Sequence, residues 1–164
     1  MSLEAGMDID YVTASAEDVQ FPDASFDVIT ACQCFMYFDK AVALPNIHRL
    51  LKDDGRFVVL FMSYLPGENE IARKSEELIL TYNPSWSGAG LNRQEAETPD
   101  WLGDLFEVNS LIVYDLNVPF TRESWHGRMK ACRGIGASLL TAEQIAAWEK
   151  EHRDYLSKVP ENFS

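Results

Sequence analysis

The sequence predicts an α/β fold, with part of a parallel sheet organised around residues 12–61. Two apolar strands are expected at 26–31 and 56–61, and a helical segment over 39–51 separates them. Apolar strands that alternate with a helix indicate parallel strands buried on both faces. The 164 residues suffice for one domain with its own core. We therefore expect a single domain of the α/β class.

Composition and charge restrict the class of protein. The sequence is 46% hydrophobic, which is typical of a globular protein. The 26 acidic residues outnumber the 14 basic ones, giving a net charge of −12 that disfavours nucleic acid as a partner. No apolar run approaches the roughly 18 residues of a membrane span, so we expect no membrane partner. The cysteines Cys32, Cys34 and Cys132 match neither a zinc spacing nor a disulfide framework, which favours a reducing cytoplasm.

The first elements follow from alternation, caps and breakers. A short strand is expected at 9–14, and the strand at 26–31 is the most apolar. Asp39 can cap the helix that follows, although Pro45 would also suit a regular helix that begins only there. Gly55 is expected to terminate this helix.

The middle of the chain reads as helix, loop and strand. Residues 68–82 place apolar side chains at helical spacing. A loop follows at 85–98, and Thr98 and Pro99 favour a short helix to about residue 105. Alternating apolar residues then predict a long strand over 106–118.

Two further helices are predicted near the end of the chain. Thr121 can cap a helix over 122–132, and Thr141 with Gln144 forms a capping box for the last helix. One face of the last helix carries four side chains at helical spacing. These are Ile145, Trp148, His152 and Leu156.

Two segments resemble a known family. Residues 16–27 read Ala-Glu-Asp-Val-Gln-Phe-Pro-Asp-Ala-Ser-Phe-Asp, and residues 50–56 read Leu-Leu-Lys-Asp-Asp-Gly-Arg. Over 9–64, the chain closely resembles the middle of a class I S-adenosylmethionine-dependent methyltransferase of the small-molecule, type 11-like branch. The resemblance implies a partial Rossmann-like sheet in a three-layer arrangement, a helical lid insertion at 62–104, and a C-terminal strand and helices at 105–164.

The resemblance also implies S-adenosylmethionine as cofactor. Ala16 and Glu17 would flank its adenine, with Asp18 as the competing acidic residue. Cys32 and Gln33 follow the apolar strand and would face the methionine part, because ligands of open α/β sheets bind at the carboxyl ends of strands. The alternative interpretation of the acidic residues is a strand-end turn that merely favours acids.

The acceptor of the methyl group would lie near residues that follow the second apolar strand. Trp125 and Arg128 share a helix face by their i, i+3 spacing, and an arginine there could bind a carboxylate. The alternative is that these side chains only pack and face solvent. The full set of candidates is Tyr64, Trp86, Trp125, Arg128 and Arg133.

No catalytic residue is assigned from the sequence. Transfer from a sulfonium requires donor and acceptor to be held in line, and only some acceptors need a base. The family often has His-Trp where this chain has Met36-Tyr37, which removes a histidine base from that position. The three histidines, His48, His126 and His152, are scattered along the sequence and receive no role.

Parts of the family pattern are not found in this sequence. The glycine-rich turn after the family's first strand and the acidic residue that ends its second strand are missing, and its last hairpin strand would follow residues 162–164. We therefore expect an internal fragment, cut at both ends, in which 26–31 and 56–61 remain neighbours. The open strand edge would pair with a second copy in a homodimer, or the strand order would be rearranged.

Three functions are compatible with the sequence. The first is S-adenosylmethionine-dependent methyl transfer to a small molecule. The second is a non-catalytic remnant of a methyltransferase fold that acts through self-association. The third, an unrelated α/β hydrolase, is disfavoured because no GxSxG elbow is present.

Overall fold

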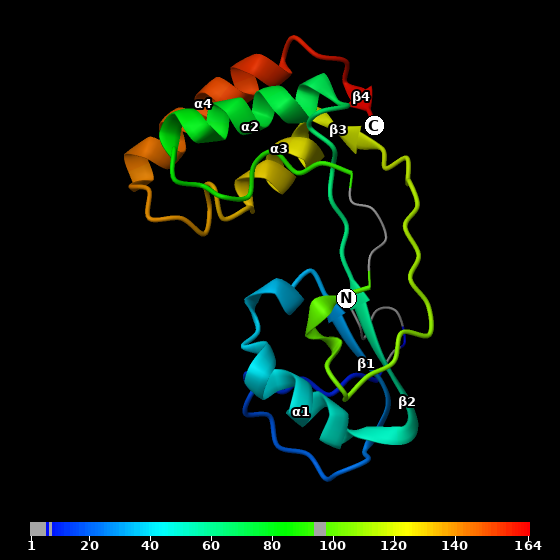
Figure 1. Ribbon diagram of the computed structural model, residues 1–164. Helices are drawn as coiled ribbons and strands as arrows, with labels where there is room; N and C mark the ends of the chain where they lie inside the picture. The colour runs from blue at the N-terminus through cyan, green and yellow to red at the C-terminus, as the bar shows by residue number, and fades with distance from the viewer. Residues whose placement is uncertain (1–5, 7, 94–97) are drawn as a thin grey trace. The chain divides into compact units, whose positions relative to one another are not determined.

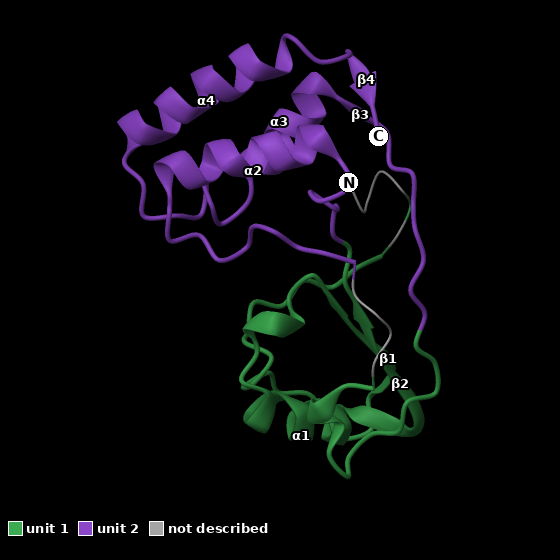
Figure 2. Ribbon diagram, turned by 45° about the horizontal axis from the view of Figure 1, so that its top comes forward, with its two compact units in different colours: residues 1–62, 97–111 green, residues 63–96, 112–164 purple. Residues whose placement is uncertain are grey.

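The computed structural model describes residues 6, 8–93 and 98–164. The chain divides into two compact units, and Figure 2 shows them in different colours. Unit 1 contains residues 1–62 and 97–111, and unit 2 contains residues 63–96 and 112–164. Each unit is described by itself below.

Unit 1 contains a parallel pair of strands. Strand β1 (Phe26–Cys32) pairs with β2 (Leu51–Leu60), with Ile29 opposite Phe57 and Cys32 opposite Leu60. The predicted strands and their adjacency are therefore confirmed. This pair fits part of a Rossmann-like sheet, whereas the lid and completion by dimerisation stay predictions.

The first part of β2 bulges away from β1. Phe26 lies opposite Leu51, but Val28 already lies opposite Arg56. Residues 52–55 of β2 therefore lie opposite the single residue Asp27 of β1, a larger irregularity than a bulge with one extra residue. Regular parallel pairing begins at Arg56, where the sequence had predicted the strand to begin.

The prediction that Gly55 ends the helix is wrong. Helix α1 (Lys40–Leu50) stops at Leu50, and Gly55 lies within β2. A Cβ atom at this position would lie 2.9 Å from the carbonyl oxygen of Lys52. The glycine is therefore explained by close approach of the backbone in the bulge.

Helix α1 begins where its cap predicts. The Asp39 carboxylate accepts a hydrogen bond from the Ala41 N–H at 3.1 Å, and Pro45 lies inside the helix rather than at its start. The buried face of α1 contains Leu44, which belongs to the core of unit 1. Aromatic rings complete that core, with Trp101 at 4.7 Å from Phe35 between ring centroids.

Two predicted strands do not form. Residues 9–14 and 106–118 adopt no regular structure, although both carry apolar side chains. A strand gains its hydrogen bonds from a neighbour, and among the described residues neither segment pairs with one. Their side chains are correspondingly exposed, for example Tyr11 at 79% and Ile112 at 72%.

Unit 2 is built mainly from three helices, α2 (Glu70–Tyr82), α3 (Arg122–Lys130) and α4 (Ala142–Leu156) (Figure 1). The antiparallel strands β3 (Phe120–Thr121) and β4 (Asn162–Phe163) pair the residues just before α3 with the residues after α4. Among the described residues, seven buried apolar side chains form its hydrophobic core. These are Ala72, Ile79, Trp125, Met129, Ile135, Trp148 and Leu156.

Caps set the starts of these helices. The predicted capping box of α4 is present, since Gln144 N–H donates to the Thr141 hydroxyl at 3.3 Å and Thr141 N–H donates to the Gln144 amide oxygen at 2.9 Å. Thr121 caps α3 as predicted.

Two short 3-10 helices, η1 (Phe35–Tyr37) and η2 (Asp100–Leu102), belong to unit 1. Among the described helices, none has the length and apolar character needed to cross a membrane.

Candidate functional site

The predicted cofactor residues Cys32 and Gln33 lie at the carboxyl end of β1, next to the carboxyl end of β2. Cys32 is the last residue of β1, and the Gln33 N–H donates to the Leu60 carbonyl at 2.9 Å. The Gln33 side-chain amide donates to the carbonyl of Met62. Gln33 also has a φ of +58°, which is uncommon for a non-glycine residue. Backbone strain of this kind is often found at functional positions.

The acidic turn is anchored to α1. The Glu17 carboxylate accepts a hydrogen bond from the Asp39 N–H at 3.0 Å, and the Ala16 carbonyl accepts one from Asn46 at 3.1 Å. Hydrogen bonds from the backbone of Glu17 itself and of Asp39 hold the pKa of Glu17 below its usual range. Asp18 instead accepts a hydrogen bond from the Ser15 hydroxyl within the turn. Glu17 is therefore the acid that ties this turn to the helix.

A small apolar hollow lies beside this turn and β1. Its volume is about 150 Å³, which is less than the roughly 300 Å³ at the lower end of ligand pockets, so it could hold only part of a ligand. Of the predicted cofactor residues, Ala16 lines it. The other lining residues are Val19, Ile29, Thr30, Ala31, Phe38, Ile47, Leu50 and Phe57.

In unit 2, the structure brings the three main acceptor candidates together. The rings of Tyr64 and Trp125 meet edge to face with centroids 5.3 Å apart, and the Arg128 guanidinium lies 5.6 Å from the centre of the Tyr64 ring. Trp125 is nonetheless a core residue, because it is 3% exposed and its indole N–H donates to the Ser75 hydroxyl at 3.0 Å. Tyr64 and Arg128 are therefore the better exposed members of this cluster.

Sequence reasoning missed Glu76, which is 4% exposed. One carboxylate oxygen, Oε2, accepts a hydrogen bond from the Gly90 N–H at 2.8 Å, whereas Oε1 is buried and accepts none. The available signal was position: Glu76 lies three residues before Ile79, on the face of α2 that is buried.

The charge of Glu76 acts on two neighbours. Burial raises the pKa of Tyr64, and the negative charge of Glu76 raises it further. Burial likewise raises the pKa of the Cys132 thiol, against a smaller lowering by Arg128. Both groups are therefore neutral near pH 7. Hydrogen bonding between the Tyr64 hydroxyl and the Glu76 carboxylate contributes to the raised pKa of Tyr64, although Oε1 is left without a well-formed hydrogen bond.

Two histidines that are 26 residues apart in sequence form a buried pair. The Nδ1 atoms of His126 and His152 lie 2.9 Å apart, and His152 Nε2 lies 3.0 Å from the Ser75 hydroxyl oxygen. The Ser75 hydroxyl donates to the Ile71 carbonyl, so it must accept from His152. Neutral His152 therefore carries its proton on Nε2, and His126 donates from Nδ1.

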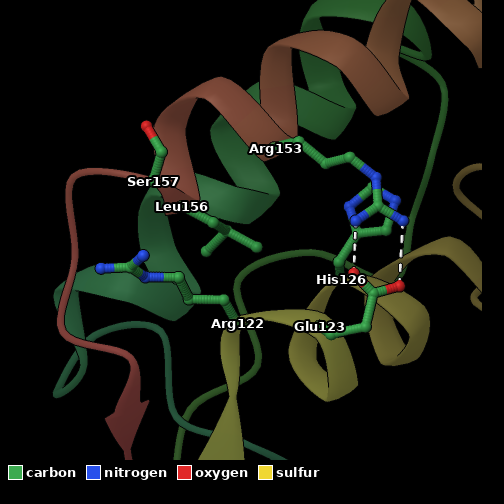
Figure 3. A pocket seen from close by; sticks show the side chains of 6 residues that line it. All are labelled: Arg122, Glu123, His126, Arg153, Leu156 and Ser157. Carbon is green, nitrogen blue, oxygen red and sulfur yellow. Dashed lines mark hydrogen bonds and ion pairs between the residues drawn. The ribbon is translucent and has the colours of Figure 1, made fainter.

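A second hollow, of about 170 Å³, borders His126 (Figure 3). Its charged groups are already paired: Arg153 binds Glu123, with one N–O distance of 3.0 Å, and Arg122 donates to the Val159 carbonyl. None of the predicted site residues lines it. The lining residues are Arg122, Glu123, His126, Arg153, Leu156 and Ser157. Within the part of the chain that the structure describes, no group of three potential ligands could hold a metal ion.

Comparison with known proteins points to one family. Residues 2–59 match the family model of a methyltransferase domain. The uncharacterized methyltransferase YcgJ of Bacillus subtilis is 31% identical over 115 residues, which cover 68% of this chain and 42% of that protein. The ubiquinone/menaquinone biosynthesis C-methyltransferase UbiE of Pseudoalteromonas translucida is 46% identical over 68 residues, or 41% of this chain and 26% of that protein.

The chain therefore spans less than half the length of these two relatives. In a structural comparison, the crystal structure of Bacillus subtilis YcgJ aligns with 99% of this chain and 70% of that chain. The sequence identity of that alignment is 24%, and its TM-score is 0.43.

Proposed function

We propose that this chain, whose residues 2–59 match the family model of a methyltransferase domain, is part of a class I methyltransferase and serves in methyl transfer from S-adenosylmethionine to a small-molecule acceptor. The family match carries the proposal. It covers β1, α1 and most of β2, which together form the parallel strand–helix–strand unit of the structure.

The residues at the carboxyl ends of β1 and β2 fit part of a cofactor site. Ligands of open α/β sheets bind at this edge, where Cys32 and Gln33 lie. Glu17 supplies an ionised carboxylate, and Ala16 borders the apolar hollow beside β1. These four residues would hold the cofactor, with Asp18 in the same turn. When bound, S-adenosylmethionine supplies a methyl group that its sulfonium already makes electrophilic.

Tyr64, Trp125 and Arg128 are proposed to contact the acceptor. This proposal is supported by their proximity, because three residues from two segments of unit 2 form one aromatic and cationic cluster. Trp125 would contribute its ring only, since its N–H already binds Ser75.

Self-association is proposed for the open edge of β1. Among the described residues β1 pairs with β2 alone, so its second edge carries no ladder hydrogen bonds. Val28 on this strand is 52% exposed. Unpaired edges with apolar side chains favour pairing with another chain, and a homodimer would satisfy them.

The cofactor proposal is tested by titrating the chain with S-adenosylhomocysteine in a calorimeter, with light scattering on the same sample to measure mass. Gln33→Gly removes the side-chain amide but tolerates the positive φ. Ala24→Gly is the matched control, because Ala24 also has a positive φ, +52°, and precedes the opposite end of β1. We expect micromolar binding, a dimer mass, and weaker binding in Gln33→Gly alone.

Three results would count against these proposals. Absence of binding at millimolar ligand would reject a cofactor site in this chain. Equal loss of affinity in both glycine variants would show that Gln33 acts through backbone conformation rather than through its amide. A monomer mass at the calorimetric concentration would reject self-association.

A further inference from the structure

We propose that Glu76 is a recognition site for a small protonated amine that carries an aromatic or apolar body. Only the identification of this amine with the methyl acceptor rests on the proposed function. The binding site itself lies within unit 2 and is argued from the contacts of that unit.

The first argument is the incomplete hydrogen bonding of a buried charge. Glu76 is 4% exposed, and its Oε1 accepts no hydrogen bond, although Oε2 is held by the Gly90 N–H at 2.8 Å. A buried carboxylate oxygen without a hydrogen bond is destabilising, because the water it lost on burial is not replaced by another donor. Such atoms are rare in native proteins and call for a partner. A ligand that donates a hydrogen bond to Oε1 would supply one.

The second argument is the sign of the charge around that oxygen. Tyr64 and Cys132 are neutral near pH 7 because burial and the charge of Glu76 raise their pKa values. Arg128 lies over the Tyr64 ring, but in the described residues no ion pair joins it to Glu76. The negative charge of Glu76 is therefore not neutralised by a directly bonded cation.

The third argument selects an amine among possible donors. An ammonium group offers three N–H donors together with a positive charge, whereas a hydroxyl group offers one donor and no charge. The Tyr64 ring, whose hydroxyl lies near the carboxylate, adds aromatic surface there, and aromatic rings attract cations. A carboxylate ligand would instead be repelled at Glu76, whatever it gained from Arg128.

Access to Oε1 depends on the segment that carries Gly90. Gly90 is exposed, has a φ of +74°, and would meet no atom within 4 Å if a Cβ were added. Its N–H nevertheless bonds the carboxylate, so this segment covers Glu76. A ligand would reach Oε1 after a shift of this segment, and the space beside Gly90 itself is open.

The test uses benzylamine as probe, with benzyl alcohol and benzoate as uncharged and anionic comparators, and monitors tryptophan fluorescence near neutral pH. Glu76→Gln keeps the size of the side chain and an acceptor for Gly90. Glu77→Gln is the matched control, because Glu77 is the next residue, is about half exposed, and pairs with Arg73 and Lys74. We expect the wild type and Glu77→Gln to bind benzylamine about tenfold more tightly than benzyl alcohol, and Glu76→Gln to lose that preference.

Several outcomes would overturn the proposal. These are no benzylamine binding at millimolar concentration, tighter binding of benzoate, or an unchanged preference in folded Glu76→Gln. Tyr64→Phe distinguishes ligand binding from a purely structural role of Glu76. If Glu76 only stabilises Tyr64, Tyr64→Phe and Glu76→Gln would lose the same stability and neither would change benzylamine binding. Binding of S-adenosylhomocysteine is measured separately, so failure of the cofactor proposal leaves this result interpretable.

Discussion

His152 carries the largest lowering of a histidine pKa that the structure shows. Burial lowers its pKa to about 3, and the positive charges of His126 and Arg153 act in the same direction. The side chain is fully buried and stacks on Trp148 with ring centroids 4.7 Å apart, and both of its ring nitrogens form hydrogen bonds. The folded chain therefore keeps His152 neutral where an unfolded chain would bind a proton.

Unit 2 should consequently lose stability on acidification. An unfolded histidine has a pKa of about 6.5. Above that pH, neither the folded nor the unfolded chain protonates His152, and the free energy of unfolding is not reduced. As the pH falls from 6.5 toward the folded pKa, the free energy of unfolding declines by at most about 1.4 kcal/mol per pH unit for each proton. His152→Gln should be less stable at pH 7 but should depend less on pH between 7 and 5. Urea unfolding monitored by circular dichroism would measure this. His48→Gln, in unit 1, is the control, and an unchanged slope in His152→Gln would contradict the expectation.

At the scale of elements, the start of α4 depends on a reciprocal cap. Thr141 and Gln144 each satisfy a backbone N–H of the other, which leaves fewer unpaired donors at the helix start. The helix then places Trp148, His152 and Leu156 in the core. The polar pair Thr141 and Gln144 at the surface thus sets where α4 begins, and with it which side chains of the helix are buried.

Removing this cap should cost measurable stability. Thr141→Ala should lower the free energy of unfolding by about 1 kcal/mol, because the Gln144 N–H loses its acceptor. Thr81→Ala is the matched control, since Thr81 is exposed and its hydroxyl donates to the Glu77 carbonyl within α2, a bond that adds little to a helix. Urea midpoints at pH 7 would compare the two, and equal losses would show that the cap contributes nothing specific.

At the scale of the whole molecule, the described residues form a hydrophobic core in each of the two units. Leu44 belongs to the core of unit 1, with Phe35 and Ala31, and Ile79 belongs to the core of unit 2. Trp101 and Phe106 pack against the first core although they follow α2 in sequence. The chain therefore leaves unit 1 after residue 62 and returns to it at 97–111.

Core truncations should act on their own unit. Leu44→Ala and Ile79→Ala each remove a buried side chain and should cost about 2–5 kcal/mol locally. Hydrogen–deuterium exchange with mass spectrometry should show lost protection in residues 26–60 for Leu44→Ala and in residues 70–82 and 122–156 for Ile79→Ala. Loss across both units in either variant would indicate one cooperative domain instead.

Much of the fold was predictable from local patterns. Caps at Asp39, Thr121 and Thr141 located three helices, and the apolar run at 26–31 located β1, because these signals lie within a few residues of the structure they specify. The family resemblance also rested on contiguous motifs, and the match of residues 2–59 confirms it.

Non-local contacts decided the rest. Residues 9–14 and 106–118 have strand-like patterns but form no strand, since a ladder requires a partner that the pattern itself does not provide. The His126–His152 pair and the unpaired oxygen of Glu76 depend on how α2, α3 and α4 pack. Periodicity shows which face of a helix is buried, but only packing determines which polar groups on that face find a partner.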